Sequence, residues 1–195
     1  MGCNVCVLEN KMKIEQSQII GKWVSSIRSE GGLGGVYFFG KDQNLMVLYG
    51  AIIDSRYQIF GTKIVESSNG KRTESNYTIE GDILTIEQIW PQKPPSECKL
   101  EMKRLGNHND HSSLIVGKWT YKHKTGAWVI QEYTADGRAQ LLVPLIIENG
   151  KYNLSGNKLS IQLKDKKNIR EISIEKNRLV FMSDEVHSEE IYLKF

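Results

Sequence analysis

Ile19-Ile20-Gly21-Lys22-Trp23 recurs almost unchanged as Ile115-Val116-Gly117-Lys118-Trp119, 96 residues further along the chain. A second match keeps the same order, since residues 39–44 correspond to residues 133–138 at a spacing of 94 residues. Matches that recur in order are the sequence signature of a duplicated structural unit. The chain is therefore predicted to contain two copies of one fold.

A third match pairs residues 77–86 with residues 152–161, which lie 75 residues further on. Both segments begin with Tyr, contain Gly at the fifth position and end in Leu-x-Ile. The shorter spacing predicts that the first copy carries about 19 extra residues, placed between positions 55 and 75.

Each copy is predicted to consist of consecutive strands joined by tight turns. In the second copy, apolar and polar residues alternate with the period of two that is typical of strands. Asn149-Gly150 and Gly156-Asn157 are dipeptides that supply the positive φ of tight hairpins. Eight strands are expected there, at residues 119–123, 128–133, 138–147, 150–154, 158–163, 168–175, 178–182 and 190–195. An up-and-down meander of this size hides its edges by closing into a small barrel.

Composition and polarity set the expected domain organisation. The chain has 195 residues, of which 39% are hydrophobic and 25% charged, with a net charge of +3, as in a cored globular protein. Residues 106–113 are polar with little to bury, which predicts a linker. We expect an N-terminal tail at 1–17, one domain at 18–105 and a second at 114–195. No apolar stretch approaches the roughly 20 residues of a transmembrane helix.

The two Gly-Lys-Trp segments resemble the opening of lipocalin-like families, especially short bacterial lipocalin-like domains that begin with Gly-x-Trp and continue into a meander. Asp136-Gly137 matches the Asp-Gly turn of those domains, whereas residues 42–44 depart from it. The resemblance implies an all-β fold of two tandem, small, antiparallel up-and-down barrels. It also implies that each Trp plugs the closed end beneath a basic residue of the last strand, for which Arg104 and Lys194 are the candidates.

Lipocalin relatives commonly bind small apolar molecules, so the resemblance favours a non-enzymatic binding module for a small hydrophobic ligand. The expected contacts are four inward aromatic side chains with two basic side chains as polar handles: Trp23, Phe38, Trp119, Trp128, Arg104 and Lys194. Alternatively, these large side chains fill the barrels completely. The chain is then a protein-interaction or inhibitor scaffold that uses loops such as 31–35 and the basic hairpin tip at 164–170.

No motif in the chain indicates catalysis, and we expect neither an enzyme nor a cofactor. The glycine-rich residues 31–35 precede a predicted strand at 36–39 instead of the helix that a phosphate-binding loop requires. His108 and His111 lie in the predicted linker and are interpreted as solvated, so no metal site is expected. The small net charge gives no reason to expect a nucleic-acid partner.

The cysteines bear on location. Cys3 and Cys6 are close to the N-terminus and Cys98 is far from both, which is no disulfide framework. The preferred interpretation is an unmodified N-terminus in the cytoplasm. An alternative is a membrane anchor, because Gly2 followed by Cys3 and Cys6 resembles doubly acylated N-termini, in which two chains give stable anchoring. Cys6 occupies the position where those N-termini prefer Ser or Thr. Membrane contact is expected only with acylation.

Overall fold

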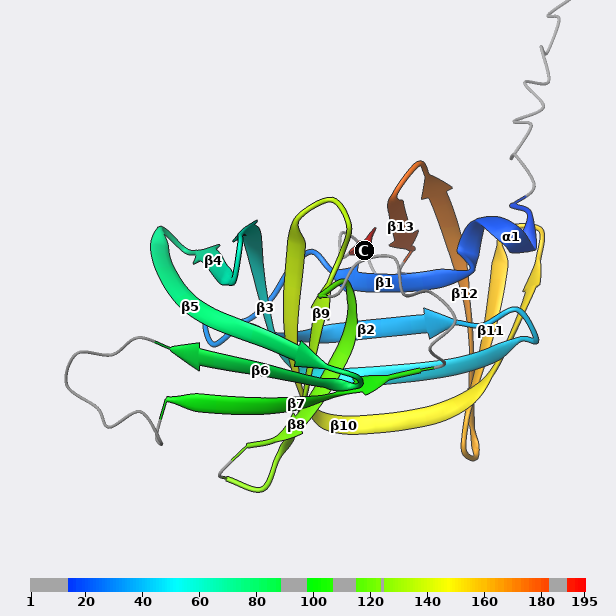
Figure 1. Ribbon diagram of the computed structural model, residues 1–195. Coiled ribbons are helices and arrows are strands. Elements are labelled where there is room, and N and C mark those ends of the chain that lie inside the picture. Colours follow the sequence, from blue (N-terminus) through cyan, green and yellow to red (C-terminus); the bar gives the residue numbers. More distant parts are fainter. Residues whose placement is uncertain (1–13, 89–97, 107–114, 124, 183–188) are drawn as a thin grey trace, which may run out of the picture. The chain divides into compact units, whose positions relative to one another are not determined.

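The computed structural model describes residues 14–88, 98–106, 115–123, 125–182 and 189–195. These residues form a one-turn helix, α1 (Gln16–Ile19), and fourteen strands, β1 to β14 (Figure 1). The strands of the first copy are β1 (Gly21–Ser25), β2 (Leu33–Phe39), β3 (Asn44–Phe60), β4 (Lys63–Ser68), β5 (Lys71–Glu80), β6 (Ile83–Gln88) and β7 (Lys99–Leu105). Those of the second copy are β8 (Gly117–Lys122), β9 (Trp128–Tyr133), β10 (Arg138–Ser155), β11 (Lys158–Leu163), β12 (Lys166–Glu175), β13 (Arg178–Phe181) and β14 (Glu190–Lys194).

Hydrogen-bonded neighbours follow the chain order from β1 to β14, β1 also pairs with β14, and one further pairing joins β3 to β10. Tight turns explain this order. For example, Asn69 and Gly70 both have positive φ, 49° and 74°, between β4 and β5, which is the twist that hairpins favour. The expected all-β, antiparallel, up-and-down arrangement is confirmed.

The duplication extends over the whole series of strands, but one predicted match is wrong. Strands β11 and β12 of the second copy correspond to β4 and β5 of the first copy, and each lies 95 residues further along the chain. The first copy therefore has no insertion of about 19 residues. Residues 77–86 form the β5–β6 hairpin, whereas residues 152–161 lie in the β10–β11 hairpin. The two hairpins share a turn sequence while occupying different places in the fold.

The long strands β3 and β10 correct the expected strand count. The predicted turn at Asn149-Gly150 is not formed, and β10 runs without a break from Arg138 to Ser155. Among the described residues, each copy consequently forms seven strands instead of eight. Gly150 allows β10 to pair closely with β11, because a Cβ there would overlap the carbonyl oxygen of Gln162 on β11. The glycine thus permits a close approach of two backbones, not a reversal of the chain.

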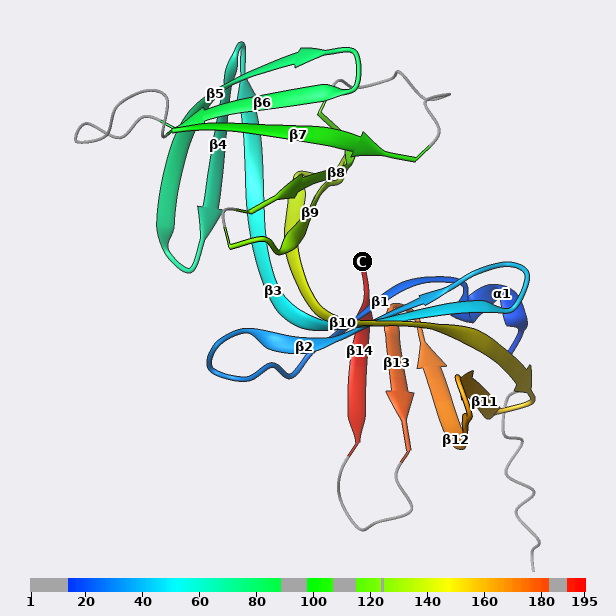
Figure 2. The same cartoon turned by 90° about the horizontal axis from the view of Figure 1, so that it is seen from below.

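The described residues divide into two compact units. Unit 1 draws on Met1–Ser29, Gly34–Tyr49 and Ile146–Phe195, and unit 2 on Glu30–Leu33 and Gly50–Leu145. These boundaries differ from the predicted domains at 18–105 and 114–195, because β3 and β10 each continue from one unit into the other (Figure 2). Of the predicted tail and linker, residues 1–13 and 107–113 lie outside the described residues.

Each unit has its own apolar core, built from both copies. The core of unit 1 surrounds Trp23 and includes Phe39 of the first copy and Tyr152 of the second. The core of unit 2 surrounds Trp119 and includes Tyr57 of the first copy and Tyr133 of the second. The strands that complete each core therefore come from different halves of the chain.

Candidate functional site

The two repeated tryptophans lie in the cores, as predicted, and both are fully buried. The indole Nε1 of Trp23 donates a hydrogen bond to the Ile19 carbonyl at 2.6 Å. The Nε1 of Trp119 donates to the Ile115 carbonyl at 2.8 Å. The apolar pair that precedes each Gly-Lys-Trp motif thus supplies the acceptor that a buried indole requires.

Arg104 and Lys194 each cover a tryptophan, although the tryptophan belongs to the other copy. The guanidinium carbon of Arg104 lies 4.0 Å from the Trp119 ring centre, and Lys194 Nζ lies 5.1 Å from the Trp23 ring centre. Strand register causes both contacts, since β7 pairs Arg104 with Trp119 and β14 pairs Lys194 with Trp23. These contacts give the four residues a structural role, and their role in ligand binding stays a prediction.

Phe38 and Trp128, predicted to point inward, lie on the opposite face of their strands. Trp128 is 59% exposed, whereas Val129 and Tyr133 of the same strand are buried. Phe38 is half-buried, and its neighbour Phe39 is the residue that enters the core of unit 1. Side chains alternate along a strand, so a register error of one residue reverses the face of every member.

Glu66 was not singled out by the sequence, yet it lies among the aromatic side chains of unit 2. The Tyr133 hydroxyl donates a hydrogen bond of 3.4 Å to its Oε1. Burial raises the pKa of the Glu66 carboxyl, and this hydrogen bond opposes part of the rise. Burial also raises the pKa of the Tyr133 hydroxyl well above its usual value, with the Glu66 charge adding to the effect.

Three further tyrosines belong to the core of unit 2 or pack against it. Tyr57 is the cross-strand partner of Glu66, and its ring packs edge-on against Tyr133 with centres 5.0 Å apart. Tyr77 and Tyr121 pack against the same core and are partly buried. The pKa of the Tyr121 hydroxyl is raised by burial and, to a smaller extent, by the Glu66 charge.

Unit 1 contains a different polar cluster. Arg170 Nη1 donates to Glu190 Oε1 at 2.8 Å, and the Tyr192 hydroxyl donates to Glu190 Oε2 at 3.3 Å. The ring of Tyr37 packs edge-on against Tyr192 with centres 5.0 Å apart. The pKa of the Tyr192 hydroxyl is raised, mainly by burial. The carboxylate of this cluster has a guanidinium partner within unit 1.

A cleft in unit 2 adds a second candidate location. Its volume is about 340 Å³, within the usual range of small-molecule sites. The lining residues are Arg56, Tyr57, Gln58, Val65, Ser67, Asp136 and Gly137. Tyr57 belongs both to this cleft and to the core beside Glu66.

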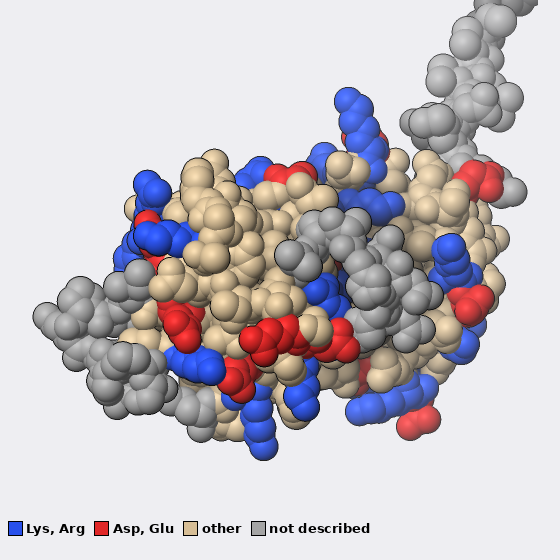
Figure 3. Space-filling view, viewed as in Figure 1, with Lys and Arg blue, Asp and Glu red and all other residues tan. Residues whose placement is uncertain are grey.

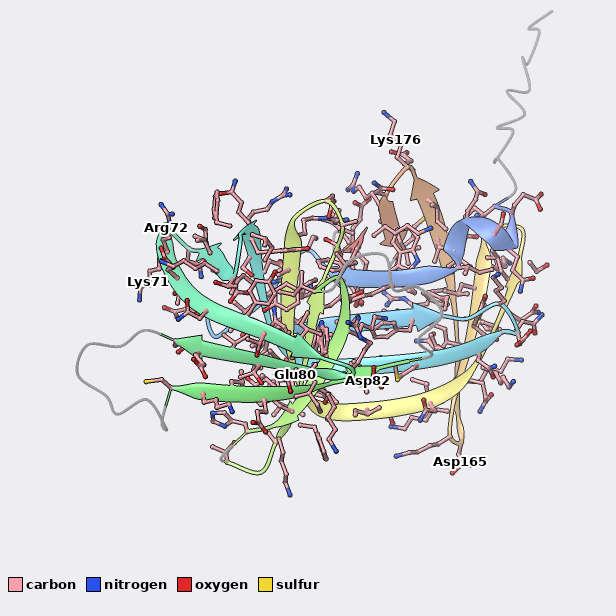
Figure 4. The ribbon with its side chains drawn as sticks, in the orientation of Figure 1. Lys71, Arg72, Glu80, Asp82, Asp165 and Lys176 are labelled. Atoms are coloured by element: carbon pink, nitrogen blue, oxygen red, sulfur yellow. The ribbon has the colours of Figure 1, made fainter. Side chains whose placement is uncertain are left out.

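Charged side chains mark the ends of hairpins. Lys71 and Arg72 begin β5, and Asp165 and Lys176 lie at turns of the second copy (Figure 4). Two basic residues of the hairpin tip predicted at 164–170 form ion pairs with acidic side chains. Lys164 lies 3.6 Å from Glu148, and Arg170 binds Glu190. Basic and acidic side chains are interspersed over the described part of the face in Figure 3.

The described residues include only some of the remaining predicted sites. Gly2, Cys3 and Cys6, with His108 and His111, lie outside the described residues, so acylation stays a prediction. Cys98 is buried with a free thiol. The described ranges contain no group of three His, Cys, Asp or Glu side chains that could hold a metal ion. They also contain no helix with the length and hydrophobicity needed to cross a membrane.

Comparison with known proteins found no relative of this chain. No family model matches the chain, and neither the curated proteins nor the solved structures contain a match.

Proposed function

We propose that the protein is a non-enzymatic binding module that holds a small, largely apolar molecule in the interior of unit 2. The observation that carries the proposal is a set of apolar side chains that pack on the core and stay partly exposed, Tyr77, Ile79, Leu100 and Tyr121. Partly exposed apolar surface beside a core is what a small ligand covers on binding.

Within this proposal, each unit is a small lipocalin-like barrel. Unit 1 combines β1, β2 and the first part of β3 with the second part of β10 and β11–β14, and unit 2 combines the remaining segments. Either set gives eight strand segments, the number at which a small barrel encloses side chains or one small ligand. Because β3 and β10 each contribute to both units, each proposed barrel combines segments of both copies. The sequence predicted instead that each copy forms its own barrel.

The test uses N-phenyl-1-naphthylamine, a neutral apolar dye whose emission rises in apolar surroundings. The full-length chain is expected to bind the dye. Leu100→Trp fills the proposed site and should weaken dye binding about tenfold or more. Trp128→Phe, on the outer face, is the matched control and should bind like the parent chain. An unchanged affinity in Leu100→Trp, or no emission rise with the parent, overturns the proposal.

A protein-interaction scaffold is the second candidate, favoured by the 59% exposure of Trp128. Exposed tryptophans are frequent energetic centres of protein interfaces. In this case the interiors are filled, and the dye stays in water. Recovery of a complex from cell extract that Trp128→Ala abolishes, together with no dye binding, would support this function over the first.

A further inference from the structure

The inference concerns the chemical class of the ligand in unit 2, and it rests on the function proposed above. Glu66 places a carboxyl group beside the aromatic and aliphatic side chains that form the core of unit 2. Within the described residues, the Glu66 side chain forms one hydrogen bond, the 3.4 Å contact from the Tyr133 hydroxyl, and no ion pair with any Lys or Arg. A partly buried carboxylate without a cation is unfavourable unless something else compensates it.

The second copy shows that the fold does not need a carboxyl group at this position. Glu66 faces Tyr57 across β3 and β4, and the equivalent pair in β10 and β11 is Tyr152 with Ile161. Ile161 is buried in the core of unit 1. The same strand position therefore accepts an aliphatic side chain, and Glu66 carries a cost that packing alone does not explain.

The hydroxyl that contacts Glu66 is also specific to unit 2. Tyr133 pairs with Gly117, and the equivalent partner of Gly21 is Phe39. Similarly, Tyr77 corresponds to Ile172, because the two residues occupy the same position in the equivalent strands β5 and β12. Unit 2 thus carries polar groups at three interior positions where unit 1 is apolar.

Unit 1 contains a glutamate beside a tyrosine that is more exposed than Glu66 and has a cationic partner. Glu190 lies beside Tyr192 and is paired with Arg170 at 2.8 Å. In unit 2, the cross-strand partners of Glu66 are Tyr57 and Thr73, and Tyr133 donates to its carboxyl group. The Glu66 charge also raises the pKa of the Tyr121 hydroxyl. Tyrosine faces attract cations without neutralising a carboxylate. Unit 1 supplies Arg170 as the positive charge beside its glutamate. The described residues around Glu66 supply no such charge.

We propose that the interior of unit 2 binds a small molecule with an apolar body and a protonated amine, with the Glu66 carboxylate as the counter-charge. The amine would donate charge-assisted hydrogen bonds to Glu66, which are stronger than those between neutral groups. The faces of the surrounding tyrosines would contribute cation–π attraction to the same charge. The partly exposed side chains Leu100 and Ile79 would contact the apolar body.

Three probes of one shape test the inference by calorimetry on the full-length chain at neutral pH. They are 2-phenylethylamine, 2-phenylethanol and phenylacetate, which are positive, neutral and negative. The amine is expected to bind about tenfold more tightly than the alcohol, with phenylacetate weakest. Glu66→Gln should abolish the preference for the amine while leaving the alcohol affinity unchanged.

Two variants keep the test interpretable. Glu66→Ile introduces the residue of the equivalent position in unit 1 and should bind N-phenyl-1-naphthylamine normally while losing the amine preference. Glu190→Gln changes the glutamate that Arg170 already neutralises and should keep the preference. Equal affinities for amine and alcohol in the parent chain, with normal dye binding, overturn this inference and leave the proposed function standing. Failure of the dye and of all three probes to bind overturns both.

Discussion

Tyr57 donates its hydroxyl to the backbone carbonyl of Thr134 at 2.8 Å, across 77 residues of sequence and from one copy to the other. The second copy repeats the arrangement, since Tyr152 donates to the Gly40 carbonyl at 2.7 Å. Both tyrosines also place their backbone N–H against a turn of the opposite copy, at Gly137 and Gln43. Each unit is therefore closed by the same contact between different halves of the chain.

Removing either hydroxyl should destabilise the protein by a similar amount. Tyr57→Phe and Tyr152→Phe each remove one hydrogen bond to a backbone carbonyl and should lower the free energy of unfolding by about 1 kcal/mol. Urea unfolding of the full-length chain measures the change. Tyr49→Phe, at an exposed side chain of β3, is the control and should be neutral. An effect in one variant alone would mean that the two contacts are not equivalent.

The unit boundaries predict which fragments fold. Residues 50–145 contain nearly all of unit 2 in one continuous segment, so this fragment should show a cooperative thermal transition by circular dichroism. Fragments 14–105 and 115–195 each divide both units and should not fold as monomers. Mixing them should restore a cooperative transition. Independent cooperative folding of both halves as monomers would contradict the assignment of the units.

Gly50 is predicted to be essential for packing between β3 and β10. A Cβ at this position would overlap the carbonyl oxygen of Val143 and crowd Pro144. Gly50→Ala should therefore lower the free energy of unfolding by about 1–3 kcal/mol, as overpacked core substitutions do. Gly35→Ala is the control, because its Cβ would lie at an ordinary 3.4 Å from the Tyr192 hydroxyl. Equal stability of the two variants would show that the strands can separate without cost.

Glu66 should make the stability of the protein depend on pH. Burial raises its pKa above the ordinary value of 4.5, so the folded protein keeps a proton that the unfolded chain releases. The free energy of unfolding should then fall as pH rises from 4.5 through the raised pKa. Glu66→Gln removes this contribution and should be the more stable protein at neutral pH. Urea unfolding across the acid-to-neutral range would show parallel profiles if Glu66 had no such effect.

Local patterns were sufficient to predict the strand content and the buried tryptophans. Trp23 and Trp119 recur after the same apolar pair, and that pair supplies their carbonyl acceptors. Tight turns such as 156–157 also fall where Gly and Asn indicated them. These features depend on residues close in sequence, which is why the chain alone reveals them.

Features that depend on distant partners were not predicted. Asn149-Gly150 has the composition of a turn, but pairing of Gly150 with Leu163 keeps the strand continuous. Trp128 was assigned to the wrong face, because alternation gives two equivalent registers until a neighbouring strand selects one. Glu66 could have been noticed by aligning 63–68 with 158–163, where it falls opposite Ile161. The incorrect third match prevented that alignment.

The continuity of β3 and β10 has a consequence for synthesis on the ribosome. Unit 2 has received almost all of its strands once residue 145 has emerged. Unit 1 needs β14 (Glu190–Lys194), the last of the fourteen strands along the chain, to pair with β1, the first of them. Domains generally fold as their chain segments become available. The interior proposed to bind a ligand is therefore complete first, while β1 and β2 remain without their later partners until β14 has been made.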